Sequence, residues 1–577
     1  MDKYEKVTEL ARRRGFLWPA FELYGGAAGF YDYGPLGAPL KRRIEDAWRK
    51  FFVIEEGFAE IECPTIGVEG IFQASGHLTG FSDPLTSCTD CKETYRADHL
   101  IKHIIEVPDA LSNEEIFAIM KENEIYCPEC GGNLSNVYEF NLMFKTMIGP
   151  GNKMPGYLRP ETAQGMFINF PRLLRYFRDT LPFAAVQIGK SFRNEISPRQ
   201  GVIRLREFTQ AEAEIFIDPR NKVHPKFAEV RDIRMKCYSR TAQEKGEPEE
   251  MTFGEAVDRG IIAHQVIAYY IARTYQFLLA VGISQNLVRL RQHKSDEMAH
   301  YAADCWDAEV FLDRLGWIEI VGIADRTDYD LKAHMALSKV NLKVFVPFDT
   351  PIRRQRLVVK PDMKVLGPRF KSKAKAIADA LSAQNPNELK NDKIDIQIDG
   401  EKVELETTLV SFETIEEEIR GEEIVPHVIE PSFGIDRIIY AVMDHAYYED
   451  NVEGETRAVL RFKPTVAPIE IAVLPLMDRE ELLSPAKEIL EGLREFGFRV
   501  DYDTSGSIGR RYRRNDEVGT PYDVTVDYET LEQQTVTIRD RDSMRQVRVK
   551  IKELSKCLQA LLSGSIQFDD VRIPIDT

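Results

Sequence analysis

A guanidinium, a carboxylate and an aromatic ring follow one another closely in residues 192–216. Arg193 and Glu195 stand two residues apart, so on a strand they would project from one face. Arg204 lies in the basic loop that follows, and Phe208 belongs to a second strand. Because a guanidinium binds phosphate in a bidentate manner and a ring stacks on a base, this hairpin is a candidate nucleotide site. The alternative is an ordinary surface hairpin of mixed charge.

A second candidate for phosphate binding lies in residues 427–440. A strand is expected to end at Glu430-Pro431-Ser432, Gly434 permits a close backbone approach, and Arg437 opens an apolar helix. An arginine in the first turn of a helix opposes the helix dipole. This placement is explained if Arg437 faces an anion.

Four of the eight cysteines form two Cys-X-X-Cys pairs, Cys88 with Cys91 and Cys127 with Cys130. Two such pairs predict a tetrahedral zinc site. Its role would be structural, because four thiolates leave no open position on the metal. The 35 residues between the pairs require a helical excursion. The alternative is four reduced thiols in a loop.

The length and composition of the chain limit the kinds of protein that could hold these groups. A chain of 577 residues with 43% hydrophobic content predicts several domains. The formal charge of −17 argues against generic nucleic-acid binding, so any such contact must come from local basic patches. There is no apolar run long enough to span a membrane and no signal-peptide core, so we expect a cytoplasmic protein without membrane partners.

The C-terminal part is expected to be a small α/β domain with a mixed sheet, because strands and helices alternate beyond a proline-bearing linker at 463–468. Four arginines around a tyrosine in this part are candidates for clamping unpaired bases: Arg510, Arg511, Arg513 and Arg514. The alternative is a basic helix facing solvent. A fallback base-binding surface is the sheet near Arg539 and Arg541.

The two arginine segments resemble motifs 2 and 3 of class II aminoacyl-tRNA synthetases, and a helix over 40–52 followed by a strand over 58–63 resembles motif 1. Residues 32–37, 159–165 and 324–331 narrow the resemblance to the archaeal and eukaryotic dimeric glycyl-tRNA synthetases. The likeness covers nearly the whole chain. It implies an α+β catalytic core built on an antiparallel sheet with insertions, plus a C-terminal α/β anticodon-binding domain.

The resemblance also implies domain bounds. We expect the catalytic domain over residues 1–460 and the anticodon-binding domain over 465–577. The catalytic domain would carry three insertions, a zinc-binding one at about 87–135, a helical one at about 218–299 and a basic, mixed α/β one at about 336–424.

The implied activity is ATP-dependent activation of glycine to glycyl-adenylate and transfer of glycine to the 3′ end of glycine tRNA, by a homodimer that uses Mg²⁺. Arg193, Arg437 and Glu319 would hold the α-phosphate, the γ-phosphate and Mg²⁺, with Glu430 as a further candidate for the metal. The implied ATP-binding set is Arg193, Asn194, Glu195, Arg204, Leu205, Phe208, Glu319, Ile320, Gly434 and Arg437. The implied glycine-binding set is Arg96, Glu161, Glu212, Arg326, Glu430 and Ser432.

Two rival functions remain open at this point. One is a class II synthetase for another amino acid, such as proline, threonine or histidine, which the C-terminal domain alone would allow. The other is a synthetase-like nucleic-acid-binding accessory subunit without ligase activity. Such a subunit should lack the ATP-binding arginines, whereas Arg193 and Arg437 are both present.

Overall fold

The computed structural model describes the whole chain except residues 103, 105–110, 152, 197, 199–200, 299–301, 387–392, 399–400, 453 and 572–577. The chain divides into two compact units, Met1–Leu342 with Val425–Thr577, and Lys343–Ile424. A search of the described residues finds no helix that is both long and apolar enough to cross a membrane.

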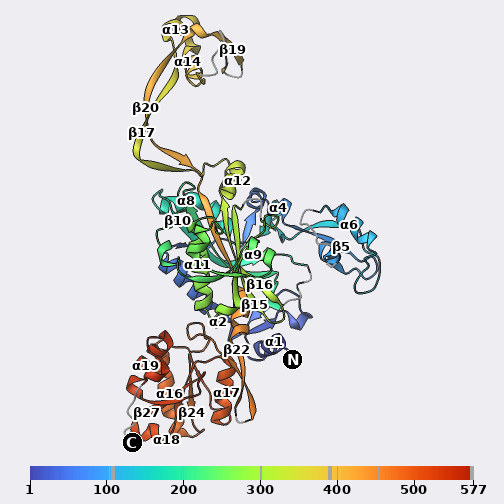
Figure 1. Cartoon of the computed structure of the whole chain (residues 1–577), viewed down its shortest axis with the longest axis vertical. Helices are drawn as coiled ribbons and strands as arrows, with labels where there is room; N and C mark the ends of the chain where they lie inside the picture. The colour runs from blue at the N-terminus through green and yellow to red at the C-terminus, as the bar shows by residue number, and fades with distance from the viewer. Residues whose placement is uncertain are drawn as a thin grey trace. The chain divides into compact units, whose positions relative to one another are not determined.

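A nine-stranded sheet forms the centre of the first unit, in the order β13-β12-β14-β15-β16-β21-β11-β10-β3 (Figure 1). All neighbours pair antiparallel except β10 with β3 and β12 with β14. The predicted antiparallel core is therefore confirmed. Its strands are β3 (Ala59–Glu60), β10 (Phe183–Phe192), β11 (Glu207–Ile217), β12 (Arg234–Tyr238), β13 (Glu249–Thr252), β14 (Val288–Gln292), β15 (Asp304–Leu312), β16 (Gly316–Thr327) and β21 (His427–Gly434).

Three helices cover this sheet with apolar side chains: α2 (Gly37–Arg49), α11 (Gln265–Ala280) and α15 (Ile435–Ala446). In α2 the buried residues Leu40, Ile44 and Trp48 recur every four positions, which makes one apolar face. A π-helical turn, η2 (Lys50–Glu55), continues α2. The helix and strand expected for motif 1 are therefore present, although the strand β3 is short.

The segment at 218–299 differs from the expected helical insertion. It contains α9 (Arg240–Lys245), α10 (Phe253–Asp258) and α11, but it also supplies β12, β13 and β14 to the edge of the central sheet. These strands were not predicted because strands of four or five residues leave little periodicity to detect. The segment extends the core rather than interrupting it.

The cysteine-bearing segment is built on a three-stranded sheet in the order β6-β5-β7, formed by β5 (Ser82–Ser87), β6 (Thr94–Arg96) and β7 (Tyr138–Asn141). The helices α5 (Ala97–Ile101) and α6 (Asn113–Glu122) lie between the two cysteine pairs in sequence, as expected. Among the described residues, four buried side chains form the centre of this segment's apolar cluster: Ala97, Ile101, Ile116 and Met120. So small a core supplies little stability by itself.

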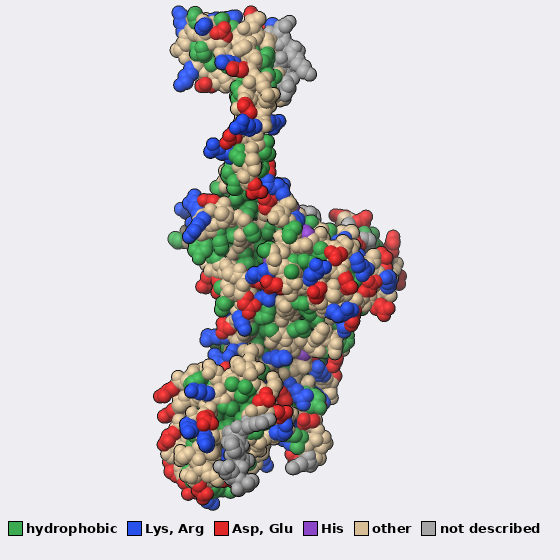
Figure 2. Space-filling model, turned by 60° about the vertical axis from the view of Figure 1, so that its left-hand side comes forward, with side chains coloured by type: hydrophobic (Ala, Val, Ile, Leu, Met, Phe, Trp, Pro, Cys, Tyr) green, Lys and Arg blue, Asp and Glu red, His purple; other side chains and the backbone are tan. Residues whose placement is uncertain are grey.

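The second unit is a long two-stranded ribbon, β17 (Val344–Pro361) with β20 (Val410–Ile424). At its end lie α13 (Met363–Phe370), α14 (Ala374–Ser382), β18 (Lys393–Ile398) and β19 (Glu401–Glu406) (Figure 1). Basic and acidic side chains lie next to one another on the ribbon (Figure 2). Lys360 pairs with Glu413 at 2.6 Å, and Arg356 with Glu417 at 3.8 Å. The basic run of the sequence is therefore partly neutralised on the ribbon.

The C-terminal part contains a five-stranded sheet in the order β25-β24-β26-β27-β28. The strand β24 is parallel to β25 and β26, whereas β26–β27 and β27–β28 are antiparallel, so the sheet is mixed as predicted. The elements are β24 (Ile471–Pro475), α16 (Glu480–Glu495), β25 (Val500–Tyr502), α17 (Ile508–Val518), β26 (Tyr522–Val526), α18 (Tyr528–Gln533), β27 (Thr535–Asp540), β28 (Gln546–Lys550) and α19 (Ile551–Ser563).

The remaining elements of the first unit are smaller or peripheral. They include α1 (Lys3–Arg13), β1 (Leu17–Pro19), β2 (Tyr31–Tyr33), β4 (Ile66–Val68), α3 (Glu69–Ala74), α4 (His77–Gly80), β8 (Lys145–Ile148), β9 (Met154–Leu158), α7 (Ala163–Ile168), α8 (Phe170–Tyr176), α12 (Tyr329–Ser338), β22 (Tyr447–Val452) and β23 (Glu455–Leu460).

Candidate active site

A pocket opens on the central sheet where β11, β16 and β21 meet the start of α15. It is lined by nine of the ten residues expected to bind ATP, all except Asn194. Ser432, expected at the glycine site, lines it as well. The lining residues that were not predicted from the sequence are Val202, Ile203, Thr209, Gln210, Gly322 and Asp436.

Arg193 projects into this pocket from the turn after β10. The strand ends at Phe192, so Arg193 and Glu195 do not stand on it as expected. Arg193 Nε donates to the Pro160 carbonyl at 3.2 Å, and the guanidinium lies 5.4 Å from the centre of the Phe208 ring. The arginine is thus held beside the aromatic ring, with further guanidinium donors available to an anion.

Arg437 enters the pocket from the first turn of α15, as predicted. Its Nε donates to the Ile203 carbonyl at 3.0 Å, and its Nη1 donates to the Glu319 carbonyl at 2.8 Å. The Glu319 carboxylate lies 3.3 Å away and is half exposed. The fixed guanidinium therefore brings positive charge to the side of the pocket where Glu319 offers carboxylate oxygens.

Asp436, in the first turn of α15, forms hydrogen bonds with Tyr33 of β2 and Thr209 of β11. This role was not predicted from the sequence. One carboxylate oxygen accepts the Tyr33 hydroxyl, and the other accepts the Thr209 backbone N–H at 2.5 Å. Burial, followed by the charge of Asp436, raises the pKa of Tyr33, so this hydroxyl remains a donor. The contact fixes the start of α15, and with it Arg437.

Buried carboxylates adjoin the pocket along β11. Glu212 Oε2 accepts hydrogen bonds from the backbone N–H groups of Thr162 at 2.7 Å and Ala163 at 2.8 Å. Its other oxygen accepts the Ser432 hydroxyl at 2.6 Å. Glu212 pairs with Ser432 in the sheet, and Ser432 also lines the pocket. Ser432 therefore links this pocket to the carboxylates.

Arg326 is the cation of this carboxylate group. It donates to Asp330 at 2.8 and 3.0 Å and to Glu430 at 2.8 Å, and all three side chains are buried. Burial raises the pKa of Glu430 to about 7, with Arg326 opposing the shift and Glu212 adding to it. Glu430 therefore titrates close to neutral pH.

Two further glutamates complete the group. Glu161 accepts from Gln164 at 2.8 Å and lies 3.5 Å from the His77 imidazole. Glu214 is fully buried, and neither of its oxygens has a hydrogen-bond partner among the described residues. Burial, with Glu430 nearby, raises the pKa of Glu214 well above its ordinary value. Glu214 was not predicted as a site residue, although its position two residues beyond Glu212 on the same strand was a signal for it.

Not every expected partner joins these carboxylates. Arg96 forms ion pairs with Asp83 at 3.0 Å and Asp98 at 2.7 Å, in the cysteine-bearing segment. Glu430 pairs with Ala324, five residues beyond Glu319 in β16. Since that spacing corresponds to about 16 Å along a strand, the expectation that Glu319 and Glu430 hold one metal is wrong.

The four cysteines of the two pairs converge. Cys88, Cys91, Cys127 and Cys130 place their sulfur atoms within 4.8 Å of one another, with Cys88 3.5 Å from Cys130 and Cys91 3.6 Å from Cys127. A tetrahedral zinc with bonds of about 2.3 Å separates its sulfur ligands by about 3.8 Å. The donor set and its spacing therefore fit this metal.

The four arginines around Tyr512 do not form one surface, and the prediction was wrong for Arg511. Arg511 is 1% exposed and donates to the carbonyl groups of Pro475 and Leu476 at 2.5 and 3.1 Å. Arg514 pairs with Asp503. Arg510 is exposed and Arg513 is half-buried. Of the four, only Arg510 and Arg513 stay as candidates for contacting RNA.

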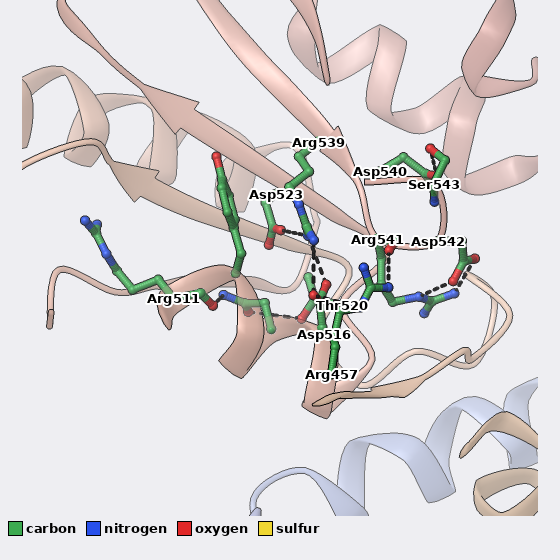
Figure 3. Close-up of polar contacts among 12 residues, drawn as sticks. Arg457, Arg511, Asp516, Thr520, Asp523, Arg539, Asp540, Arg541, Asp542 and Ser543 are labelled. Carbon is green, nitrogen blue, oxygen red and sulfur yellow. Dashed lines mark hydrogen bonds and ion pairs between the residues drawn. The ribbon is translucent and has the colours of Figure 1, made fainter. Parts of the chain in front are cut away.

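Arg539 and Arg541, near which the fallback surface was expected, are themselves too buried to contact RNA. Arg539 pairs with Asp516 at 2.9 Å and with Asp523 at 2.8 Å (Figure 3). Arg541 donates to the Gly519 carbonyl at 2.9 Å and accepts from Arg457 of β23 through its own carbonyl at 2.9 Å. These arginines stabilise the packing of the C-terminal sheet.

Comparison with known protein families agrees with this architecture. Residues 148–446 match the family model described as "tRNA synthetase class II core domain (G, H, P, S and T)", and residues 470–561 match "Anticodon binding domain".

Similar curated proteins bear the name glycine–tRNA ligase. The chain is 70% identical over 575 residues to one from Methanothrix thermoacetophila, and the match covers 100% of both chains. It is 52% identical to the one from Methanothermobacter thermautotrophicus, with 97% of this chain and 99% of the relative covered. It is also 52% identical to the one from Archaeoglobus fulgidus, with 96% of each covered.

Solved structures with a similar fold include a Giardia lamblia prolyl-tRNA synthetase in complex with prolyl-adenylate. The TM-score is 0.53 at 12% identity, with 98% of this chain and 79% of that chain covered. A Cryptosporidium parvum prolyl-tRNA synthetase complexed with L-proline and AMP gives a TM-score of 0.50 at 13% identity, with 97% and 75% covered. At these identities the likeness concerns the fold alone.

Proposed function

Because the chain belongs to the class II aminoacyl-tRNA synthetases and, within that class, to the glycine–tRNA ligases, we propose that the pocket of Arg193 and Arg437 binds ATP and that the adjoining carboxylates bind glycine. The ligase uses ATP to activate glycine as glycyl-adenylate. It then transfers the glycyl group to the 3′ end of glycine tRNA. The observation that carries the assignment of sites is the junction at Ser432, which lines the pocket and donates to Glu212.

Activation requires the glycine carboxylate to attack the α-phosphate of ATP, with pyrophosphate leaving. This step depends on positioning and on neutralising negative charge more than on acid–base chemistry. Arg193 is proposed to hold the α-phosphate while Phe208 stacks on the adenine, which the packing of the guanidinium beside the ring supports. Arg437 is proposed to hold the γ-phosphate.

We propose Glu319 as the residue that binds Mg²⁺ in this pocket. Oxygen ligands suit Mg²⁺, which usually keeps several waters and is held by one or two carboxylates together with substrate phosphates. Glu319 fits because its carboxylate is half exposed, and Glu309 pairs with it across the neighbouring strand. When bound, the metal would neutralise phosphate charge.

Recognition of glycine is proposed to depend on carboxylates that accept hydrogen bonds from its ammonium group. An ammonium offers three donors, and Glu161, Glu212 and Glu430 are acceptors from separate segments. Arg326 is better suited to bracing them than to binding the glycine carboxylate, because its guanidinium already donates to Asp330 and Glu430. Rejection of alanine is then steric, since its methyl group would meet closely packed walls.

Three finer features are part of the proposal. A structural zinc bound by Cys88, Cys91, Cys127 and Cys130 is supported by the convergence of the four sulfur atoms. Binding of tRNA by the C-terminal domain is assigned to Arg510 and Arg513, which are not committed to the sheet as Arg511 is. The active form is proposed to be a cytoplasmic homodimer that associates through motif 1.

The proposed ATP site is tested by single-turnover formation of glycyl-adenylate. Arg193→Ala should reduce the rate by at least about a hundredfold, because it removes a charge that stabilises the reacting phosphate. Arg231→Ala, at a half-exposed arginine outside the pocket, is the matched control and should behave like the wild type. Near-normal adenylate formation by Arg193→Ala would refute the assignment.

A further inference from the structure

A β-bulge in β16 contains Arg326, the arginine that contacts the carboxylates. Asp325 of β16 pairs with Ile429 of β21. The preceding residue of β21, Val428, pairs with Thr327, so the strand register skips Arg326. Arg326 is therefore the extra residue of the bulge. Arg326 lies two residues beyond Ala324, which pairs with Glu430, so strand alternation puts the side chains of Arg326 and Glu430 on one face. The bulge bends the strand and sets where on this face the Arg326 guanidinium lies.

The bulge requires an unfavourable backbone conformation at Thr327. Its φ angle is 55°, in the left-handed region. Threonine is branched at Cβ and disfavours this region, which glycine and, less often, asparagine or aspartate adopt. Such a residue keeps this conformation only where surrounding contacts enforce it.

The enforcing contact comes from Asp325. Its Oδ1 accepts the Thr327 backbone N–H at 3.0 Å. Its Oδ2 accepts from Lys222 Nζ at 2.6 Å and lies 3.0 Å from His264 Nε2. The Asp325 side chain is fully buried, so these contacts hold its carboxylate in one orientation. His264 caps the start of α11, and Lys222 lies in the segment after β11.

We propose that Asp325 is a positioning residue for glycine recognition: by holding Thr327 in the left-handed conformation, it fixes the bulge that directs Arg326 onto Glu430 and Asp330. The inference rests on the proposed glycine site, because Arg326 and Glu430 are charged members of that site. Asp325 itself contacts Lys222 and His264 rather than these residues, so it acts through Arg326.

The test compares KM for glycine and KM for ATP in pyrophosphate exchange by the full-length protein. Asp325→Ala should raise KM for glycine about tenfold, because unsupported left-handed strain corresponds to a factor of that order. Its KM for ATP should stay unchanged. Asp325→Asn keeps an oxygen that accepts the Thr327 N–H but turns its amide N–H groups toward the donors of Lys222 and His264, so its KM for glycine should rise, though less than that of Asp325→Ala.

Rescue separates this role from general destabilisation. In Asp325→Ala/Thr327→Gly the glycine adopts the left-handed conformation without strain, so KM for glycine should return to within about threefold of the wild type. Asp444→Asn is the matched control, because Asp444 is also a buried aspartate but pairs with Lys3 rather than with the residues around Asp325. This control should leave KM for glycine unchanged.

Two results would overturn the positioning role: an unchanged KM for glycine in Asp325→Ala, or no recovery with Thr327→Gly. If Asp325→Ala does not fold, Lys222→Met replaces it, and a KM for glycine that does not rise would overturn the role. Arg326→Lys and Glu430→Gln distinguish this failure from failure of the glycine site. If neither raises KM for glycine, the proposed site is wrong. If both do and Asp325→Ala does not, only the positioning role is wrong.

Discussion

At the scale of single residues, the proposed active site combines fixed cations with buried carboxylates whose pKa values differ. Arg193 and Arg437 are held by backbone carbonyl groups, which leaves further donors for phosphate. Glu430 and Glu214 are buried where burial and neighbouring carboxylates favour their protonated forms. A ligand with a positively charged ammonium group favours the ionised carboxylates over the protonated ones, so the affinity for glycine should depend on pH.

Binding of glycine should weaken as the pH falls below 7. The pKa of Glu430 is raised to about 7, so the free protein carries a proton on this group at lower pH. In the proposed site the glycine ammonium would pair with the ionised Glu430 carboxylate, so the proton must leave Glu430 first. KM for glycine in pyrophosphate exchange should therefore level off above about pH 8 and rise up to about tenfold per unit below pH 7.

Glu430→Gln is the matched control for this pH dependence. It removes the titrating group, so KM for glycine should be high and nearly independent of pH over the same range. A wild-type KM for glycine that is constant from pH 6 to 8 would contradict the assignment of Glu430. The groups that face Glu430 include Arg326, Glu212, Glu161 and Glu214, so the observed pKa belongs to the group of carboxylates.

Single residues were predictable where a local pattern carries the chemistry. Arg193, Phe208 and Arg437 could be found because each stands in a short motif. Asp436 could not be assigned a role, because its partners Tyr33 and Thr209 lie more than two hundred residues away in sequence. Glu214 was missed although its place two residues beyond Glu212 on one strand was a signal for it. The burial of Arg511 left a weak trace, since Arg511, Asn515 and Val518 recur at helical spacing on the buried face of α17.

At the scale of elements, the cysteine-bearing segment is expected to depend on its metal. The segment has a small apolar cluster, so metal binding should supply much of its folding free energy. Metal analysis of protein purified without chelator should find one zinc per chain. Chelation should make residues 87–135 sensitive to protease while the central sheet stays resistant.

Cys127→Ser tests the zinc prediction with a matched control. Cys127 is buried in the sulfur cluster, so its replacement should abolish stoichiometric zinc. Cys557→Ser, in α19 and outside the cluster, should keep one zinc per chain. Protein without zinc that retains wild-type protease resistance in this segment would show that the four cysteines are reduced thiols.

The helix α17 should separate tRNA binding from activation. Arg510→Ala/Arg513→Ala should leave glycine-dependent pyrophosphate exchange nearly unchanged and reduce tRNA charging, because both residues lie outside the pocket. Removing one arginine–phosphate interaction should flatten the salt dependence of tRNA binding by about one unit of slope or slightly less. Lys552→Ala/Lys556→Ala removes the same charge from exposed positions on α19 and should not affect charging.

A parallel fall in exchange and charging for Arg510→Ala/Arg513→Ala would mean that the helix is structural. No change in either activity would place tRNA recognition on another surface. Arg511 is unsuitable for this test, because its removal would leave the carbonyl groups of Pro475 and Leu476 without their buried donor.

At the scale of the whole molecule, the chain is proposed to act as a homodimer. Large apolar side chains at the end of the motif 1 helix and in η1 (Glu22–Tyr24) are exposed, with Ile54 73% and Leu23 95% accessible. Exposed apolar groups of this size are candidates for contact with a second copy of the chain. Sedimentation should show a dimer at micromolar concentration, and Ile54→Arg should favour a monomer that activates glycine poorly.

Val223→Arg is the control for the dimer, because it introduces the same charge at an exposed apolar position outside motif 1. It should sediment as the wild type does. A wild-type monomer with full activity at micromolar concentration would contradict the dimer.

The fold class and the C-terminal sheet were predictable from the sequence. The strands β12 to β14 were not, because four or five residues are too few to show a periodicity.

The central claim is that the pocket and the buried carboxylates together activate glycine. Pyrophosphate exchange by the wild-type protein, measured with each of the twenty amino acids, tests it most directly. We expect exchange with glycine and at most a trace with alanine, because the proposed site would bind the glycine ammonium through its carboxylates and the methyl group of alanine would meet its walls. The claim would be contradicted if exchange required proline, threonine or histidine instead of glycine. It would also be contradicted if none of the twenty amino acids supported exchange.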